Sequence, residues 1–206
     1  MKIVVISDDS LQKELLAQGV EDGIQIEWQS EINIVQDADS YIDLLFSHSA
    51  ERIDKLKQLQ PATVIVNAVN NTLDEMPAGF IRINGWNSFL NPPIMEAAGA
   101  DADKKKAENI FSCFNKKIEW GPDVPGFITA RVISMIINEA YFTLEEKVST
   151  KEEIDTAMKL GTNYPYGPFE WGTHIGLKNV FALLTILAET NSRYTASPLL
   201  QKEAQF

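Results

Sequence analysis

Residues with metal-binding or redox chemistry are scarce in this sequence. Its 206 residues include one cysteine, Cys113, and two histidines, His48 and His174. A single cysteine excludes an internal disulfide framework and a multi-cysteine zinc site. The two histidines are far apart and lack the spacing of zinc ligands. We therefore expect no metal centre.

Positive charge and long apolar runs are also in short supply. The chain has 18 lysines and arginines against 29 aspartates and glutamates, which gives a formal net charge of −11. Binding of nucleic acid without sequence preference depends on cations that meet phosphates, so this balance argues against a nucleic-acid partner. No apolar run approaches the ~18 residues of a membrane-spanning helix. No secretory leader is recognisable, so the sequence predicts a cytoplasmic protein without a membrane partner.

Residues 1–123 alternate short β-branched runs with helical patterns. The runs that predict strands are 2–7, 24–28, 41–46, 63–66, 80–83 and 117–120. Asp8, Asp9 and Ser10 are all residue types that cap helices, and they precede the first helical pattern. A second, charged helix at 50–60 ends before Pro61. This alternation predicts an α/β fold with a parallel sheet.

The pattern changes at 121–126, where two glycines and two prolines occur within six residues. Beyond this point, apolar residues recur at helical spacing in 127–147 and 176–189, and residues 150–153 form a capping box. We therefore predict two domains, 1–123 and 124–206. The first has 20 acidic and 11 basic side chains, so most of the negative charge belongs to it.

Four motifs in the second part resemble the C-terminal helical domain of the 3-hydroxyacyl-CoA dehydrogenases. They are, in order, VPGFI at 124–128, EIDTAMKLG at 153–161, YPYGPFEW at 164–171 and SPLL at 197–200. The resemblance implies a Rossmann-like N-terminal domain with a reduced parallel sheet, followed by an all-α dimerisation domain. It also implies NAD as cofactor, acyl-CoA as ligand and a homodimer formed through the C-terminal helices.

The resemblance extends into the first domain and locates a candidate site. In the family, a histidine and a glutamate twelve residues later take the proton of the 3-hydroxyl while NAD takes the hydride. A gapless alignment places Asn84 at the histidine position and Glu96 at the glutamate position, which are the candidate catalytic positions. Asn87 matches the family's asparagine three residues after the histidine. Thr72, in the segment matching an Asn-Thr-Ser-Ser loop, either offers a hydroxyl to an acyl-CoA carbonyl or is a turn residue.

Several departures from the family pattern bear on activity. Asn84 has no titrating group and cannot be a general base, and Glu96 alone is a poor substitute or simply a solvated carboxylate. The turn at 7–10 lacks the glycines that let a backbone approach a pyrophosphate. Ala130 stands where the family has an active-site asparagine. Glu27, near the end of the second predicted strand, is the remaining candidate for binding the ribose of the cofactor.

Three functions remain open from the sequence. The first is a degenerate 3-hydroxyacyl-CoA dehydrogenase of acyl-CoA and fatty-acid metabolism. Such a pseudoenzyme would have lost most NAD-dependent hydride transfer and would bind acyl-CoA or serve in assembly. The second is an active NAD-dependent dehydrogenase with an altered site, and the third is a non-catalytic dimeric interaction module. The stretch between Trp28 and Tyr41 lacks room for the family's helical insertion, which favours the first.

Overall fold

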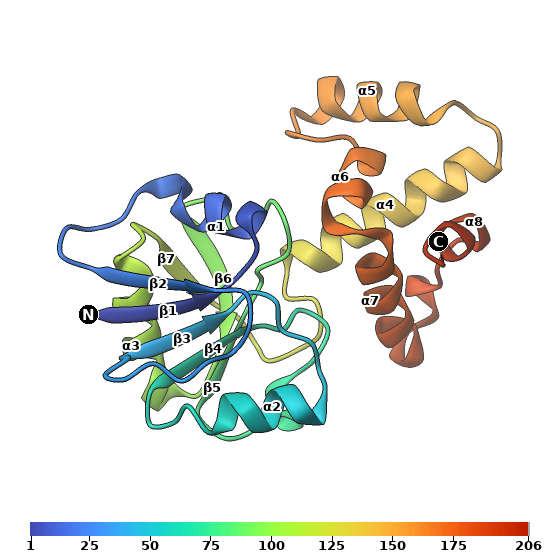
Figure 1. Ribbon diagram of the computed structural model, residues 1–206. Coiled ribbons are helices and arrows are strands. Elements are labelled where there is room, and N and C mark those ends of the chain that lie inside the picture. Colours follow the sequence, from blue (N-terminus) through green and yellow to red (C-terminus); the bar gives the residue numbers. More distant parts are fainter. Residues whose placement is uncertain (206) are drawn as a thin grey trace. The chain divides into compact units, whose positions relative to one another are not determined.

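The computed structural model describes residues 1–205 and divides after Phe127 into two compact units (Figure 1). This division and the predicted boundary at 123 fall within the same segment, which connects the last strand to the first helix of the second unit. None of the helices within residues 1–205 combines the length and apolarity needed to cross a membrane.

The first unit is a seven-stranded sheet with helices on both faces, and all six predicted strands are present. Its strands are β1 (Lys2–Ile6), β2 (Gln25–Gln29), β3 (Ser40–Asp43), β4 (Thr63–Asn67), β5 (Phe80–Ile83), β6 (Ile94–Ala98) and β7 (Lys117–Trp120). Its helices are α1 (Asp9–Leu15), α2 (Ala50–Lys57) and α3 (Asp101–Ser112).

The strand order is β2-β1-β3-β4-β5-β6-β7. Strands β1 to β5 are mutually parallel, β6 runs antiparallel to β5, and β7 is parallel to β6. The predicted α/β class with a mostly parallel sheet is therefore confirmed. Strand β6 was not predicted, because two alanines and a glutamate weaken its β-branched pattern.

Both faces of the sheet are buried, which explains the unbroken apolar runs of its central strands. Ile3 and Val5 point to the face covered by α1 and α3, where Leu15 and Phe111 pack. Val4 points to the opposite face, which is covered by α2. Asp8 caps α1 by accepting a hydrogen bond from the Leu11 amide at 2.9 Å, as the sequence predicted.

The second unit is entirely helical in its described part. Its helices are α4 (Thr129–Glu145), α5 (Lys151–Thr162), α6 (Pro168–Ile175), α7 (Leu177–Thr190) and α8 (Pro198–Glu203). The predicted capping box is present at the start of α5, formed by Thr150 and Glu153. Asp155 of α5 accepts the Phe169 amide at 2.8 Å and so holds the start of α6 against α5.

Candidate functional site

The carboxyl ends of the parallel strands form the edge of the sheet where ligands are expected. In open α/β sheets, ligands bind outside these ends at the point where the strand order reverses. Strand β1 lies between β2 and β3, so the chain first goes to one side of β1 to form β2 and then to the other side to form β3. The reversal is therefore at the carboxyl ends of these three strands.

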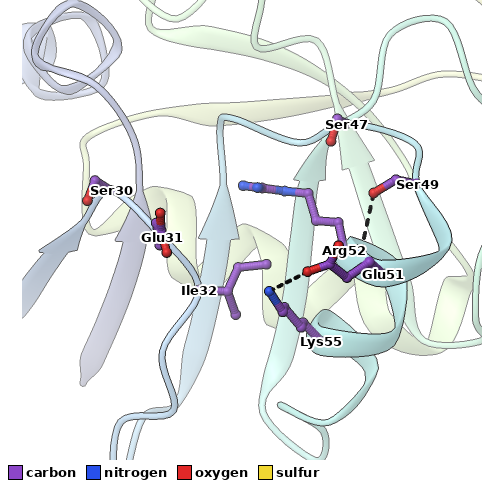
Figure 2. A pocket seen from close by; sticks show the side chains of 8 residues that line it. All are labelled: Ser30, Glu31, Ile32, Ser47, Ser49, Glu51, Arg52 and Lys55. Atoms are coloured by element: carbon purple, nitrogen blue, oxygen red, sulfur yellow. Dashed lines mark hydrogen bonds and ion pairs between the residues drawn. The ribbon is translucent and has the colours of Figure 1, made fainter.

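A polar pocket of about 350 Å³ lies beside this reversal (Figure 2). It is formed by the segments that follow β2 and β3 and by the first turns of α2. Its lining residues are Ser30, Glu31, Ile32, Ser47, Ser49, Glu51, Arg52 and Lys55. Three of these residues have hydroxyl groups and four are charged, so the pocket suits a polar ligand.

Both cations of the pocket are already paired with carboxylates. Arg52 donates from Nε and Nη2 to the two carboxylate oxygens of Asp43, at 2.7 and 2.6 Å. Lys55 donates to Glu51 at 2.8 Å. Asp43 is fully buried at the end of β3, and this burial raises the pKa of its carboxyl while the Arg52 guanidinium opposes the rise. The same ion pair raises the pKa of Arg52.

The charge balance of the pocket disfavours a phosphate. Within each of the two ion pairs the positive and negative charges cancel. Glu31 remains as one further carboxylate in the lining. A like charge 4 Å away costs on the order of 4 kcal/mol at an effective dielectric constant of ~20. The pocket therefore fits neutral hydroxyl groups, which serines and Glu31 can bind, better than it fits an anion.

The turn after β1 does not fit the pyrophosphate of a dinucleotide. In Rossmann folds this group accepts hydrogen bonds from the first amides of the helix that follows β1. Here the Leu11 amide already donates to the Asp8 carboxylate at 2.9 Å. Asp9 adds a second carboxylate in the same turn, and no glycine is present. Negative charge thus lies where the pyrophosphate of NAD would bind.

Asn84 and Glu96, the two candidate catalytic positions, are in direct contact. Asn84 follows β5 and is 2% exposed, while Glu96 lies in the neighbouring strand β6. The Asn84 side-chain amide donates to the Glu96 carboxylate at 3.0 Å, and the Asn84 backbone amide donates to the Glu96 carbonyl at 3.0 Å. The pair has the geometry of an amide oriented by a carboxylate, so it can bind a polar group but the amide cannot take up a proton.

Asn67 is a residue that the sequence analysis did not single out. It ends β4, and its side-chain nitrogen donates to the Leu44 carbonyl at 3.1 Å and to the Gly85 carbonyl at 3.0 Å. Its side-chain oxygen accepts the Gly85 amide at 2.9 Å. Asn67 therefore joins the carboxyl ends of β3, β4 and β5 beside Asn84. The sequence signal that could have identified Asn67 is its position directly after the β-branched run at 63–66.

The two predicted substrate-binding residues occupy different surroundings. Asn87 is half-buried in the loop between β5 and β6, three residues beyond Asn84. The Thr72 hydroxyl donates to the carboxylates of Asp74 and Glu75 in a short helical turn after β4. The local bonds of Thr72 match its alternative interpretation as a turn residue.

Glu27 lies within β2 rather than at its end. It accepts a hydrogen bond from Gln29 at 3.0 Å and lies 3.9 Å from the Lys2 ammonium. Glu31, which follows the strand and lines the polar pocket, is better placed to bind a sugar hydroxyl. The sequence did not single out Glu31 because β2 ends at Gln29, one residue later than the predicted strand.

Among residues 1–205, no three His, Cys, Asp or Glu side chains cluster as a metal site would require.

Comparison with known proteins relates the helical unit to one family. Residues 126–205 match the model of the 3-hydroxyacyl-CoA dehydrogenase C-terminal domain. A 3-hydroxybutyryl-CoA dehydrogenase of Bradyrhizobium diazoefficiens is 36% identical over 138 residues, which are 62% of this chain and 46% of that protein. A probable 3-hydroxybutyryl-CoA dehydrogenase of Deinococcus radiodurans is 27% identical over 88% of this chain and 71% of its own length. The chain spans less than half the length of several of the curated relatives it matches.

Solved structures share the fold of the whole chain. A (S)-3-hydroxybutyryl-CoA dehydrogenase from Ralstonia eutropha aligns with a TM-score of 0.74 at 18% identity, covering 98% of this chain and 92% of that one. The FadB2 protein of M. tuberculosis aligns with a TM-score of 0.78 at 14% identity, covering 99% and 93% of the two chains. At these identities the likeness concerns the fold alone.

Proposed function

We propose that this chain, which belongs to the 3-hydroxyacyl-CoA dehydrogenase family, acts in acyl-CoA and fatty-acid metabolism as an acyl-CoA-binding protein with little or no hydride transfer. The contact between Asn84 and Glu96 is the observation that carries this proposal. General acid–base catalysis needs a group that exchanges a proton near neutral pH, and a side-chain amide does not.

The N-terminal turn supports the same proposal from the cofactor side. The Asp8 carboxylate occupies the helix amide that a pyrophosphate would need, and Asp9 repels the same group. We therefore expect weak binding of NAD. Asn84 and Asn87 are the residues that we propose to meet the acyl-CoA, through hydrogen bonds to its carbonyl groups.

An assay with acetoacetyl-CoA and NADH tests the proposal. General acid–base catalysis contributes about 10²–10⁴-fold to such reactions, so we expect NADH oxidation at least about 100-fold slower than that of an active dehydrogenase measured in parallel. Isothermal titration with acetoacetyl-CoA should still show binding. A rate equal to that of the active dehydrogenase contradicts the proposal.

Glu96→Gln distinguishes this proposal from an active enzyme that uses Glu96 as its base. If Glu96 were the base, Glu96→Gln would abolish turnover, whereas we expect the small residual rate to be unchanged. Asn84→His is the complementary variant, because it introduces a titrating group beside the Glu96 carboxylate. If acetoacetyl-CoA does not bind at high micromolar concentration, the remaining function is that of a dimeric interaction module.

We further propose that the chain forms a homodimer through its C-terminal helices. The helical unit presents large apolar side chains to solvent: Ile128 is 60%, Val132 50% and Leu160 83% exposed. Apolar residues of this size at a surface favour a protein–protein contact.

A further inference from the structure

Within residues 1–205, no strand lies beside the outer edge of β2. Strand β2 is the first in the sheet order and pairs with β1 alone. In the usual six-stranded dinucleotide-binding sheet, the second strand is an interior strand with the third strand outside it. Here the chain proceeds from β2 to the other side of β1, so the position outside β2 is left without a strand from the described residues.

The segment between β2 and β3 cannot supply the missing strand. It comprises only residues 30–39, which connect β2 to β3 and contain no strand. Its apolar residues Ile32, Val35 and Ala38 pack on the sheet face covered by α2. The connection is thus bound to a face of the sheet rather than laid along its edge.

The hydrogen bonds between β2 and β1 identify which backbone groups of β2 point outward. The Gln25 amide donates to the Met1 carbonyl, and the Gln29 carbonyl accepts from the Ser7 amide, both at 3.0 Å. Backbone groups alternate in direction along a strand, so Gln25, Glu27 and Gln29 pair with β1. Ile26 and Trp28 consequently direct their amides and carbonyls away from the sheet. Two donors and two acceptors are therefore available for another strand.

The charge around this edge selects its partner. Residues 21–31 contain Glu21, Asp22, Glu27 and Glu31 and no lysine or arginine. Glu21, Asp22 and Glu31 are exposed, and the Glu27 side chain is 44% exposed. Lys2 of β1 lies 3.9 Å from Glu27 and forms an ion pair with it. An acidic edge of this kind attracts a basic strand.

A second copy of this chain is a poor occupant of the same edge. If two β2 strands paired antiparallel over their full length, the central Glu27 of one would face the Glu27 of the other. Like charges directly opposite each other destabilise strand pairing. The surrounding acidic residues would repel each other as well, so self-pairing is disfavoured while a basic segment is favoured.

We propose that the free edge of β2 binds an extended basic segment of another protein, which adds a strand to the sheet. The side chains of Ile26 and Trp28 pack on the face covered by α1 and α3, while Glu27 points to the other face. The partner strand therefore places a lysine or arginine opposite Glu27 and apolar side chains beside Ile26 and Trp28. Main-chain bonds supply affinity and the alternating side chains supply specificity.

A short synthetic peptide tests this inference by fluorescence anisotropy. The probe is fluorescein-labelled Ser-Val-Lys-Val-Lys-Val-Ser, and the matched control replaces both lysines by glutamates. We expect the lysine peptide to bind and the glutamate peptide to bind at least about tenfold more weakly, since the ion pair is replaced by a repulsion. Equal binding of the two peptides overturns the proposal.

Two N-methylated versions of the lysine peptide test strand addition itself. One has methyl groups on the valine amides and the other on the lysine amides, so that each blocks the donors on one side of the peptide. In a strand, only one side can pair with β2, so one version must lose binding and the other retain it. Loss with methylated valines indicates antiparallel pairing, and loss with methylated lysines indicates parallel pairing. Equal binding by both versions contradicts strand addition.

Protein variants locate the binding at β2. We expect Glu27→Lys to weaken binding of the lysine peptide about tenfold and Glu27→Gln to have an intermediate effect. Glu189→Lys is the matched control, because it makes the same charge change at an exposed position of α7 and should leave binding unchanged. Unaltered binding by Glu27→Lys overturns the proposal, provided that circular dichroism shows a folded variant. The assay needs no acyl-CoA, so its result is separate from that for the proposed function.

Discussion

At the scale of single residues, Asn84 and Glu96 form a polar contact in which the side chain at position 84 does not titrate. The backbone of Asn84 bonds to that of Glu96 across neighbouring strands, and their side chains also meet at 3.0 Å. Such a contact requires a polar side chain at each position but not a titrating one. The Asn84 amide therefore supplies an oriented polar group that does not accept a proton.

Arg82 and Asp123 form an ion pair in which only the arginine is fully buried. Arg82 is fully buried in β5 and donates to Asp123 at 2.9 Å and to the Val124 carbonyl at 2.8 Å, and its burial lowers its pKa to about 10. Asp123 retains a side chain that is 32% exposed. Asp123→Ala leaves a buried charge without its carboxylate and should destabilise the fold by about 3–5 kcal/mol.

Arg82→Met provides the comparison for this prediction. The remaining Asp123 carboxylate can be hydrated, so this variant should lose less stability than Asp123→Ala. Urea denaturation of the two variants measures the difference in free energy of unfolding. A larger loss for Arg82→Met would contradict this account of the pair.

Lys116 should make stability depend on pH in the alkaline range. Its ammonium is buried and donates to the Leu90 carbonyl at 2.5 Å and to the Pro92 carbonyl at 3.1 Å. Burial lowers its pKa from 10.5 to about 8. Between these two values the unfolded chain holds the proton more firmly than the folded chain, so the contribution of Lys116 to stability rises with pH. Below about pH 8 both states are protonated and the desolvation penalty is fully present.

Chemical denaturation at pH 7.5 and pH 10 checks this prediction with the variant Lys116→Met. The stability of the natural protein relative to the variant should be greater at pH 10 than at pH 7.5. Lys57→Met, at an exposed lysine at the end of α2, is the control and should show no such change. If the stability of the natural protein relative to Lys116→Met were lower at pH 10 than at pH 7.5, this would be inconsistent with a buried, desolvated ammonium.

At the scale of elements, the carboxyl ends of β3, β4 and β5 are joined through one side chain. The Asn67 amide makes three hydrogen bonds to backbone groups of Leu44 and Gly85. A Cβ at Gly85 would lie 2.9 Å from the Asn67 Cγ, closer than such atoms approach. Gly85 is therefore required by the close approach of two elements.

Gly85→Ala should destabilise the first unit by about 1–3 kcal/mol, because the added methyl group forces Asn67 away from its partners. Gly161→Ala is the matched control, since a Cβ there meets nothing within 4 Å and should be neutral or slightly stabilising. Thermal or urea denaturation compares the two variants. Equal stability of both variants would mean that Asn67 moves freely and does not hold the site.

At the scale of the whole molecule, self-association should depend on the helical unit. We expect sedimentation velocity at micromolar concentration to show a dimer, and Val132→Asp to weaken it about tenfold or more by placing a charge in an apolar contact. Ile34→Asp is the matched control, because Ile34 is 74% exposed in the first unit. A monomeric natural protein, or an equal effect of both substitutions, would contradict dimerisation through α4.

Much of this architecture could be predicted from the sequence because it depends on local patterns. The β-branched runs of β1 and β4 predicted buried strands, and the capping residues Asp8 and Thr150 predicted helix starts that the structure confirms. The four motifs of the helical part predicted its family. Strand β6 was missed because its pairing with β5 across the sheet, rather than its own composition, keeps it extended.

The sequence by itself determined the fold class, the acidic character and the absence of a titrating side chain at position 84, since these follow from residue types and their spacing. Only the tertiary structure decided which residues meet. It brought Asn84 to Glu96, recruited Asn67, put Glu31 rather than Glu27 beside the polar pocket, and left the edge of β2 open. These outcomes depend on strand order and register, which arise from packing between distant segments and leave no signal in any single stretch of sequence.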